Sequence, residues 1–197
     1  MLLKPFLNKY TFNLFLEQMN LLSFIQRVQI AILKKSSSKM KIAYLRKQGM
    51  KIGKNCRFNT MSFSTEPYLI EIGDHVAIAD GSDLITHDGG IWCFRDEIEH
   101  ADIFGEIKIG NNVFIGNRCI ILPNTRIGNN CIVGAGSVLR GKFPDNSVIV
   151  GNPAKVILNM SMQKFLYKQN PGLLRTENTP SSKKAKIVKK HFGLNTE

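Results

Sequence analysis

Histidines are the first candidates for chemistry in this sequence, because an imidazole takes up and releases a proton near neutral pH. The chain has four, His75, His87, His100 and His191. His87 follows a short aliphatic run and precedes an aspartate and two glycines, so it stands where regular backbone gives way to a loop. Functional side chains concentrate at such junctions of scaffold and loop. We interpret His75 as a solvent-facing side chain and His191 as part of a tail.

Four cysteines, Cys56, Cys93, Cys119 and Cys131, form no CxxC pair and have no histidine at zinc-ligand spacing. We therefore expect no metal site and no disulfide framework, with the thiols reduced. Cys93 is a conceivable nucleophile, but only His87 and Arg95 lie close enough in sequence to favour its thiolate. Covalent catalysis is accordingly disfavoured.

The net charge of +12 is unevenly distributed along the chain. Residues 52–156 hold 9 Lys+Arg and 12 Asp+Glu, so the excess of positive charge lies entirely in the flanks. A nucleic-acid-binding domain needs basic side chains over its folded surface, and we expect no nucleic-acid partner. The basic flanks suit a solvated surface, an anionic glycan or peripheral contact with an anionic membrane.

The first 35 residues are apolar but interrupted by charges, and no stretch reaches the roughly 18 to 20 apolar residues that cross a bilayer. No small-residue cleavage site follows a short apolar run. We expect a cytoplasmic protein that contacts the membrane only peripherally, at its inner face.

Aliphatic residues recur every six positions in the centre of the chain. This column comprises Ile109, Ile115, Ile121, Ile127, Val133 and Leu139. Glycine follows the aliphatic residue in four of these six hexads, and the fifth position is small or β-branched in five of them. Cys119, Cys131 and, in a weaker copy, Cys56 occupy this fifth position, which indicates a structural role for all three.

A six-residue unit is too short for a helical repeat, but it suits a short strand and a turn made by glycine or asparagine. Stacked units of this kind bury the aliphatic column and hydrogen-bond to the units above and below. Weaker copies cover 52–58 and 72–84. The rhythm fails at 59–70 and at 88–106, which we interpret as insertions that loop out of a solenoid.

The hexad pattern and the ending Gly151-Asn152-Pro153-Ala154-Lys155-Val156 resemble the hexapeptide-repeat acyltransferase family. Within it, the chain looks most similar to bacterial O-acetyltransferases that modify capsular, exopolysaccharide or lipopolysaccharide sugars. The resemblance implies an all-β core, folded as a left-handed parallel β-helix with three hexads per coil. It also implies a homotrimer with active sites between subunits.

We predict three segments: a helical N-terminal extension over 1–50, the β-helix acyltransferase domain over 51–157 with its loop insertion 88–106, and 158–197. Apolar spacing at 10–35 and 39–48 favours helices that cap the open end of the solenoid. The last segment is expected to form a short helix near 158–169 and then a basic, partly disordered tail rich in Ser, Thr and Lys.

The resemblance implies an acetyl-CoA-dependent O-acetyltransferase, which needs a base because a protonated hydroxyl is a poor nucleophile. The family's catalytic histidine lies where the β-helix gives way to an insertion, and His87 occupies that place. The implied reaction is direct transfer without an acyl-enzyme, with backbone N–H groups stabilising the oxyanion. His100 is the reserve candidate, and either Asp88 or a backbone carbonyl is expected to orient the imidazole.

In the family, the pantetheine arm of coenzyme A follows the later coils over small residues. The matching positions are Gly116, Asn117, Gly134, Ala135 and Gly136. Asn117 and Ala135 are 18 residues apart, so they would stack in coils of three hexads.

Three cations match the contacts to the cofactor's phosphates: Arg140, Lys142 and Lys155. The match is incomplete, because Arg140-Gly141-Lys142 replaces the family's Thr-Lys pair and Leu158 stands where a second basic residue is expected.

The acceptor is expected beside the two insertions. Asn59 aligns with an acceptor-binding asparagine of sugar acetyltransferases, Asp88 neighbours the base, and Trp92 could stack on a sugar ring or cover the core.

Other functions stay open at this stage. N-acetylation of an amino sugar and serine O-acetylation are the enzymatic alternatives. A carbonic-anhydrase-like metal site is disfavoured, because His75, His87 and His100 do not stack on an 18-residue coil. A catalytically silent scaffold or a nucleotide-sugar-binding module is the non-enzymatic alternative.

Overall fold

The computed structural model describes residue 25 and residues 27–195, and the chain divides into two compact units, 1–160 and 161–197. The predicted helical spacing at 10–24 lies outside the described residues. No helix in the described part is long and apolar enough to span a bilayer.

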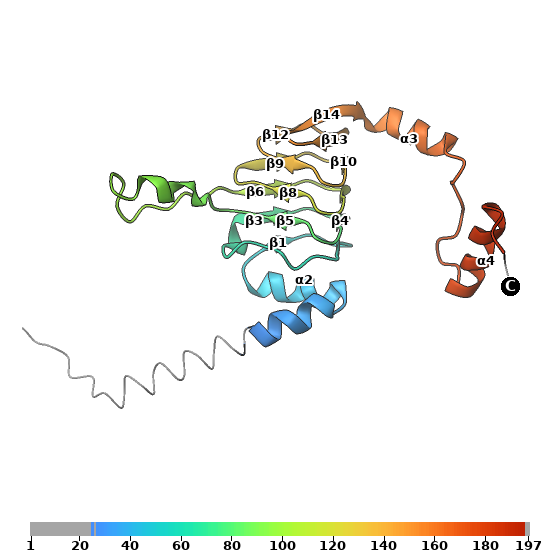
Figure 1. The fold of residues 1–197 in the computed structure, drawn as a ribbon, viewed down its shortest axis with the longest axis horizontal. Helices are drawn as coiled ribbons and strands as arrows, with labels where there is room; N and C mark the ends of the chain where they lie inside the picture. The colour runs from blue at the N-terminus through green and yellow to red at the C-terminus, as the bar shows by residue number, and fades with distance from the viewer. Residues whose placement is uncertain (1–24, 26, 196–197) are drawn as a thin grey trace, which may run out of the picture. The chain divides into compact units, whose positions relative to one another are not determined.

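Short strands of the first unit form three sheets, which the chain visits in turn. Sheet A contains β1 (Lys51–Ile52), β3 (Ile70–Ile72), β6 (Ile107–Ile109), β9 (Thr125–Ile127) and β12 (Lys142–Phe143). Sheet B contains β2 (Arg57–Phe58), β4 (Val76–Ile78), β7 (Val113–Ile115), β10 (Cys131–Val133), β13 (Ser147–Gly151) and β14 (Ala154–Asn159). Sheet C contains β5 (Asp83–Leu84), β8 (Ile120–Ile121) and β11 (Val138–Leu139). We call one passage through the three sheets a coil, and the coils stack as successive layers in Figure 1.

Neighbouring strands within each sheet are parallel, except that β14 runs antiparallel to β13. Strand register pairs Ile109 with Ile127 and Ile121 with Leu139, so residues 18 apart are stacked. The predicted aliphatic column is confirmed as the core, because each of its six members is at most 3% exposed. Cys119 and Cys131 are also buried, as their place in the hexad predicts, while Cys56 is partly buried.

Asparagines make the turns at the corner between sheets A and B. Asn112, Asn130 and Asn146 have φ angles of 55°, 53° and 59°, a left-handed conformation that asparagine tolerates better than most residues. Their side chains are linked, with Asn112 Nδ2 donating to Asn130 Oδ1 at 2.9 Å and Asn130 Nδ2 donating to Asn146 Oδ1 at 3.1 Å. Close stacking at this corner requires glycine, because a Cβ on Gly110 would lie 2.8 Å from a backbone carbon of the next coil.

Helix α2 (Ser38–Lys47) closes one end of the stack, below β1 in Figure 1. Ser37 caps its N-terminus, because the hydroxyl accepts a hydrogen bond from the Met40 amide. Ile42 and Leu45 of this helix are buried in the same core cluster as the strands. A helix therefore covers the open end of the core, as the apolar spacing of residues 39–48 predicts. Residues 27–35 are also helical.

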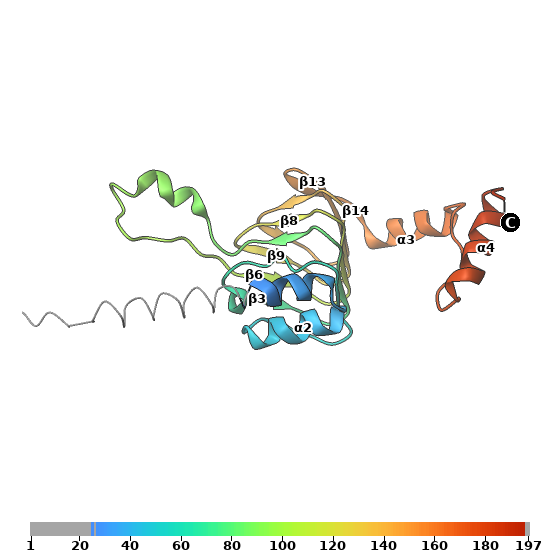
Figure 2. The same cartoon turned by 60° about the horizontal axis from the view of Figure 1, so that its bottom comes forward.

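The two irregular segments differ from each other. Residues 88–106 leave the sheets, contain the short helix η2 (Gly89–Phe94), and project away from the coils in Figures 1 and 2. Residues 59–70 are not wholly looped out, which corrects the prediction. Phe63 pairs with Leu84 in parallel beside sheet C, and η1 (Pro67–Leu69) leads into β3 at Ile70.

In the second unit, α3 (Met160–Gln169) begins at the unit boundary and agrees with the helix predicted near 158–169. Helix α4 (Ser181–His191) occupies the part of the chain where we predict a disordered tail, and that prediction is wrong. Lysine and alanine are strong helix formers, and basic side chains in the last turn interact favourably with the helix dipole. Charge content alone therefore did not indicate the helix.

Candidate active site

His87 is held at the base of the 88–106 insertion, just after β5. It forms an antiparallel bridge with Phe104. On either side, the amide of Gly105 donates to the carbonyl of Thr86 at 2.7 Å, and the amide of Asp88 donates to the carbonyl of Ile103 at 2.9 Å. These bonds join the two ends of the insertion into a narrow neck, and they fix the backbone of His87 at the corner between sheets C and A.

Glu66 contacts the imidazole of His87, an arrangement that sequence reasoning missed. Glu66 Oε2 lies 3.0 Å from His87 Nδ1, and Ser64 Oγ lies 3.1 Å from the same nitrogen. The same carboxylate oxygen accepts hydrogen bonds from Ser64 Oγ at 3.1 Å and from Thr86 Oγ1 at 2.8 Å, while Thr65 donates to Oε1. Three hydroxyl groups therefore orient the carboxylate that orients the imidazole.

The electrostatics of Glu66 determine which nitrogen of His87 is available. Burial raises the pKa of Glu66, but hydrogen bonds from Thr65, His87, Thr86 and Ser64 outweigh it and lower the pKa to about 2. The carboxylate is thus ionised at neutral pH, and the ring tautomer that we assign beside it donates a hydrogen bond from Nδ1–H to the carboxylate. That assignment leaves Nε2 unprotonated and able to act as a base.

A cleft of about 380 Å³ opens beside His87. Its lining comes from both irregular segments and includes Glu66, Asp88, Ile91, Trp92, Arg95, Asp102 and Phe104. Trp92 has 77% of its surface exposed, so it forms part of the cleft wall rather than covering the core. Arg95 donates to the Ala101 carbonyl at 2.6 Å and pairs with Asp102 at 2.8 Å, which holds the insertion in its folded-back shape.

Asp88 does not orient the imidazole, so this option of the sequence analysis is corrected. Its carboxylate accepts from the Gly90 amide at 3.0 Å, at the start of η2, and pairs with Arg140 Nη2 at 3.3 Å. The Gly90 hydrogen bond is the largest influence on the pKa of Asp88, and together with Arg140 it lowers that pKa. Asp88 therefore links the insertion to the corner that follows β11.

The residues predicted to hold the pantetheine arm lie together at the corner between sheets B and C. The amide of Gly136 donates to the carbonyl of Asn117 at 2.9 Å, so these two turns stack as their spacing predicts. Ala135 is exposed, and a Cβ on Gly116 would lie 2.6 Å from the Ala135 nitrogen. This corner is consequently lined with small residues and closely packed backbone.

Several predicted site residues lie elsewhere. Asn59 is outside the lining of the His87 cleft, and its carbonyl accepts a hydrogen bond from Lys41 Nζ at 2.8 Å. Lys142 lies in β12 of sheet A and Lys155 in β14, also outside that lining. Arg140 reaches Asp88 in this structure. Their predicted contacts with the acceptor and with the cofactor's phosphates stay predictions.

His75 and His100 do not line the cleft. The Nδ1 atom of His75 lies 2.9 Å from Asn112 Oδ1, at the corner between sheets A and B. Within residues 25 and 27–195, no group of three histidine, cysteine or carboxylate side chains is arranged to hold a metal ion.

Comparisons with known proteins agree with this architecture. The family model described as bacterial transferase hexapeptide (six repeats) matches residues 106–141. The chain is 42% identical to Protein CapG of Staphylococcus aureus over 149 residues, which cover 74% of this chain and 85% of that protein. It is 32% identical to the putative lipopolysaccharide biosynthesis O-acetyl transferase WbbJ of Escherichia coli (strain K12), over 51% of this chain and 55% of that protein, or about half of WbbJ.

A solved structure also matches. The maltose O-acetyltransferase from Clostridium difficile 630 superposes with a TM-score of 0.52 and 27% identity, covering 68% of this chain and 83% of that chain.

Proposed function

Because this chain belongs to the hexapeptide-repeat family of bacterial transferases, we propose that it transfers the acetyl group of acetyl-CoA to a sugar hydroxyl in a surface polysaccharide or its precursor. Two of the similar proteins are named as a putative lipopolysaccharide biosynthesis O-acetyl transferase and a maltose O-acetyltransferase, which supports an acetyltransferase that acts on sugars. The observation that carries the proposal is the hydrogen-bonded pair of Glu66 and His87 at the edge of an open cleft.

The reaction follows from this geometry. A sugar hydroxyl gives its proton to His87 Nε2 while its oxygen attacks the thioester carbonyl carbon. The imidazolium that forms is stabilised by the ionised Glu66, which stays hydrogen-bonded to Nδ1. Backbone N–H groups stabilise the tetrahedral oxyanion. When the C–S bond breaks, the leaving thiolate takes the proton from His87, and the imidazole returns to its neutral state.

The proposed function also assigns residues that bind coenzyme A and the sugar. The small-residue corner at Gly116, Asn117 and Gly134–Gly136 would hold the pantetheine arm, and Arg140, Lys142 and Lys155 would contact the phosphates. Trp92 would stack on the sugar in the cleft, beside Asp88. Asn59 would also contact the acceptor, from a position outside the residues that line the His87 cleft.

Membership of the family also supports a proposal for the closure of the three sheets and for the assembly of the chains. The three sheets would be the faces of a closed left-handed β-helix, within a domain spanning 51–157, and three such chains would assemble with active sites between them. The apolar outward residues of sheets B and C, such as Phe114 and Ile120, suit faces covered by other copies. We place the protein in the cytoplasm, with peripheral contact at the inner face of the membrane through its basic flanks.

The test is release of free thiol from acetyl-CoA, screened against sugars, nucleotide sugars, amino sugars and serine. We expect thiol release that depends on a hydroxylated sugar and not on serine. Binding of acetyl-CoA without transfer to any sugar would contradict the proposal and favour a binding module.

A further inference from the structure

Sheet A carries a column of charge on its outer face that the other sheets lack. Strand register aligns one outward residue from each of its five strands, namely Lys51, Glu71, Lys108, Arg126 and Lys142. The aligned residues of sheet B are Arg57, Ala77, Phe114, Ile132 and Val148, and those of sheet C are Asp83, Ile120 and Val138. Since neighbouring strands lie about 4.8 Å apart, the cations of sheet A form a closely spaced ladder.

Two rungs of this ladder share one carboxylate. Glu106 Oε2 lies 3.1 Å from Lys108 Nζ and 3.4 Å from Arg126 Nη2. The Lys108 hydrogen bond is the main reason why the pKa of Glu106 is lowered, so this carboxylate is ionised at neutral pH. Glu71 is aligned with Lys108, so the four cations of the column face two carboxylates, Glu71 and Glu106, and a net charge of +2 remains. This surface also lines a cavity of about 350 Å³. Exposed pairs of this kind contribute little to stability, so the column is not required by the fold.

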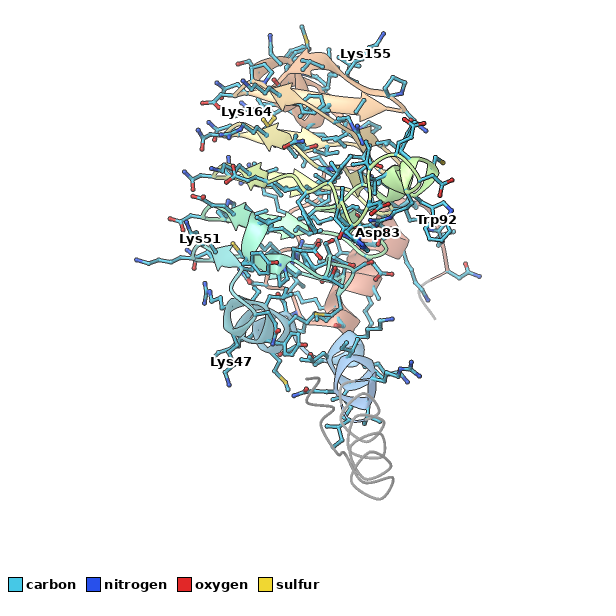
Figure 3. The ribbon with its side chains drawn as sticks, turned by 90° about the vertical axis from the view of Figure 1, so that its left-hand side faces the viewer. Lys47, Lys51, Asp83, Trp92, Lys155 and Lys164 are labelled. Carbon is cyan, nitrogen blue, oxygen red and sulfur yellow. The ribbon has the colours of Figure 1, made fainter. Side chains whose placement is uncertain are left out.

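The column begins close to the catalytic corner. Phe104 pairs with His87, and β6 begins three residues later at Ile107. With an advance of about 3.3 Å per residue, Lys108 lies within roughly 13 Å of Phe104 along the strand. In Figure 3, Lys51 marks the side of the ribbon occupied by sheet A, and Trp92 lies on the other side of the view. A ligand a few sugar units long is therefore able to reach from the cleft onto the column.

The cleft itself has the opposite charge. Its lining contains the carboxylates of Glu66, Asp88 and Asp102. Asp102 is paired with Arg95 and Asp88 with Arg140, so three carboxylates face two guanidinium groups and one negative charge is in excess. An anionic sugar in the cleft would be repelled by these carboxylates, whereas an anionic group on sheet A would be attracted.

We propose that the acceptor is an acidic glycan, an inference that rests on the proposed function. An uncharged unit of the glycan enters the cleft beside His87, and neighbouring units that carry carboxylate or phosphate groups lie against Lys108 and Arg126. The phosphates of the cofactor have the same chemistry as these groups, so the experiment has to separate the two sources of negative charge.

The experiment measures binding by calorimetry, so it does not depend on turnover. The full chain is titrated with a half-methyl-esterified hexameric oligogalacturonate, which offers both uncharged and acidic units, or with neutral maltohexaose, each with and without saturating coenzyme A. We expect the acidic oligosaccharide to bind in preference, with an affinity that falls as sodium chloride is added. Loss of two exposed charge contacts in Lys108→Gln/Arg126→Gln should weaken this binding about tenfold.

The double variant Arg57→Gln/Arg118→Gln is the matched control, because it removes the same charge from two exposed positions of the first unit that lie outside sheet A. It should change the affinity by less than about twofold, because only charge near the column is involved. Equal weakening in both double variants, or equal binding of the two oligosaccharides, would overturn the proposal. Displacement of the oligogalacturonate by coenzyme A would assign the column to the cofactor instead. Absence of thiol release with every sugar would count against the proposed function, not against this binding result.

Discussion

The regular coils of this protein form its rigid frame, whereas the two irregular segments supply most of the residues that line the candidate active site. In the coils, equivalent positions repeat the same contacts, as in the linked side chains of Asn112, Asn130 and Asn146. The irregular segments repeat nothing, yet they provide Glu66, Trp92 and most of the cleft. His87 lies where the two regimes meet. A stacked repeat supplies a rigid frame, and its interruptions are free to carry side chains with individual roles.

The largest expected effect separates the junction from the coils. We expect His87→Ala to lower kcat by roughly 10² to 10⁴, because no second histidine is among the described residues that line the cleft. Acetyl-CoA affinity, measured by calorimetry, should change little. His75→Ala is the matched control, since this histidine lies at a coil corner, and it should keep normal turnover. Normal turnover of His87→Ala would move the base elsewhere, with His100 as the next candidate.

The second effect concerns stability and should be confined to the coils. Ile121 is fully buried in the core, so Ile121→Ala is expected to lower the free energy of unfolding by about 2–5 kcal/mol. Ile98 lies in the insertion with 47% of its surface exposed, and Ile98→Ala should change stability by less than about 1 kcal/mol. Chemical denaturation monitored by circular dichroism measures both. Similar losses for the two variants would show that the insertion is as tightly packed as the coils.

A third effect is that the free energy of unfolding depends on pH through the ionisation of Glu66. Its pKa is lowered from 4.5 to about 2 in the folded chain, so the folded state favours the ionised carboxylate. Its contribution to stability is therefore fully present above pH 4.5 and is lost as the pH falls towards 2. We expect the difference in unfolding free energy between the wild type and Glu66→Gln to shrink over this range. A constant difference from neutral pH down to pH 2 would contradict the role of the ionised form.

The smallest expected effect tests a single link of the repeated corner. Asn130→Ala removes two exposed side-chain hydrogen bonds and places alanine at a positive φ, so a loss of about 1–2 kcal/mol is expected. Asn130→Gly removes the same bonds without the conformational cost, and it should be the more stable of the two. Thermal unfolding compares them directly. The opposite order would mean that the corner does not depend on left-handed backbone.

The regular part of the fold was predictable because its physical cause recurs in the sequence. Ile109, Ile121 and Leu139 occupy the first position of their hexads, which faces the core. The fifth position also faces the core, which explains the burial of Cys119 and Cys131. The irregular parts have no such recurrence. Glu66 lies 21 residues before its partner, in a segment where the rhythm fails, so spacing did not connect it to His87.

A weaker signal for Glu66 was present. Ser64, Thr65 and Glu66 are three consecutive polar side chains able to form hydrogen bonds in a segment otherwise flanked by apolar residues, and they precede a proline. Asp88 was a reasonable choice to orient His87 because it is adjacent in sequence, but side chains of consecutive extended residues point in opposite directions. Helix α4 was missed because composition was read as disorder without regard to helix propensity.

The reversed strand β14 has a consequence for the behaviour of the protein at high concentration. A stack of parallel coils could in principle be extended by another molecule, layer upon layer, into a fibre. At one end α2 covers the core, and at the other the antiparallel pairing of β13 with β14 changes the direction of the exposed edge. In sheet B an incoming parallel coil therefore meets an edge strand of the opposite direction, which disfavours end-to-end stacking of molecules through that sheet.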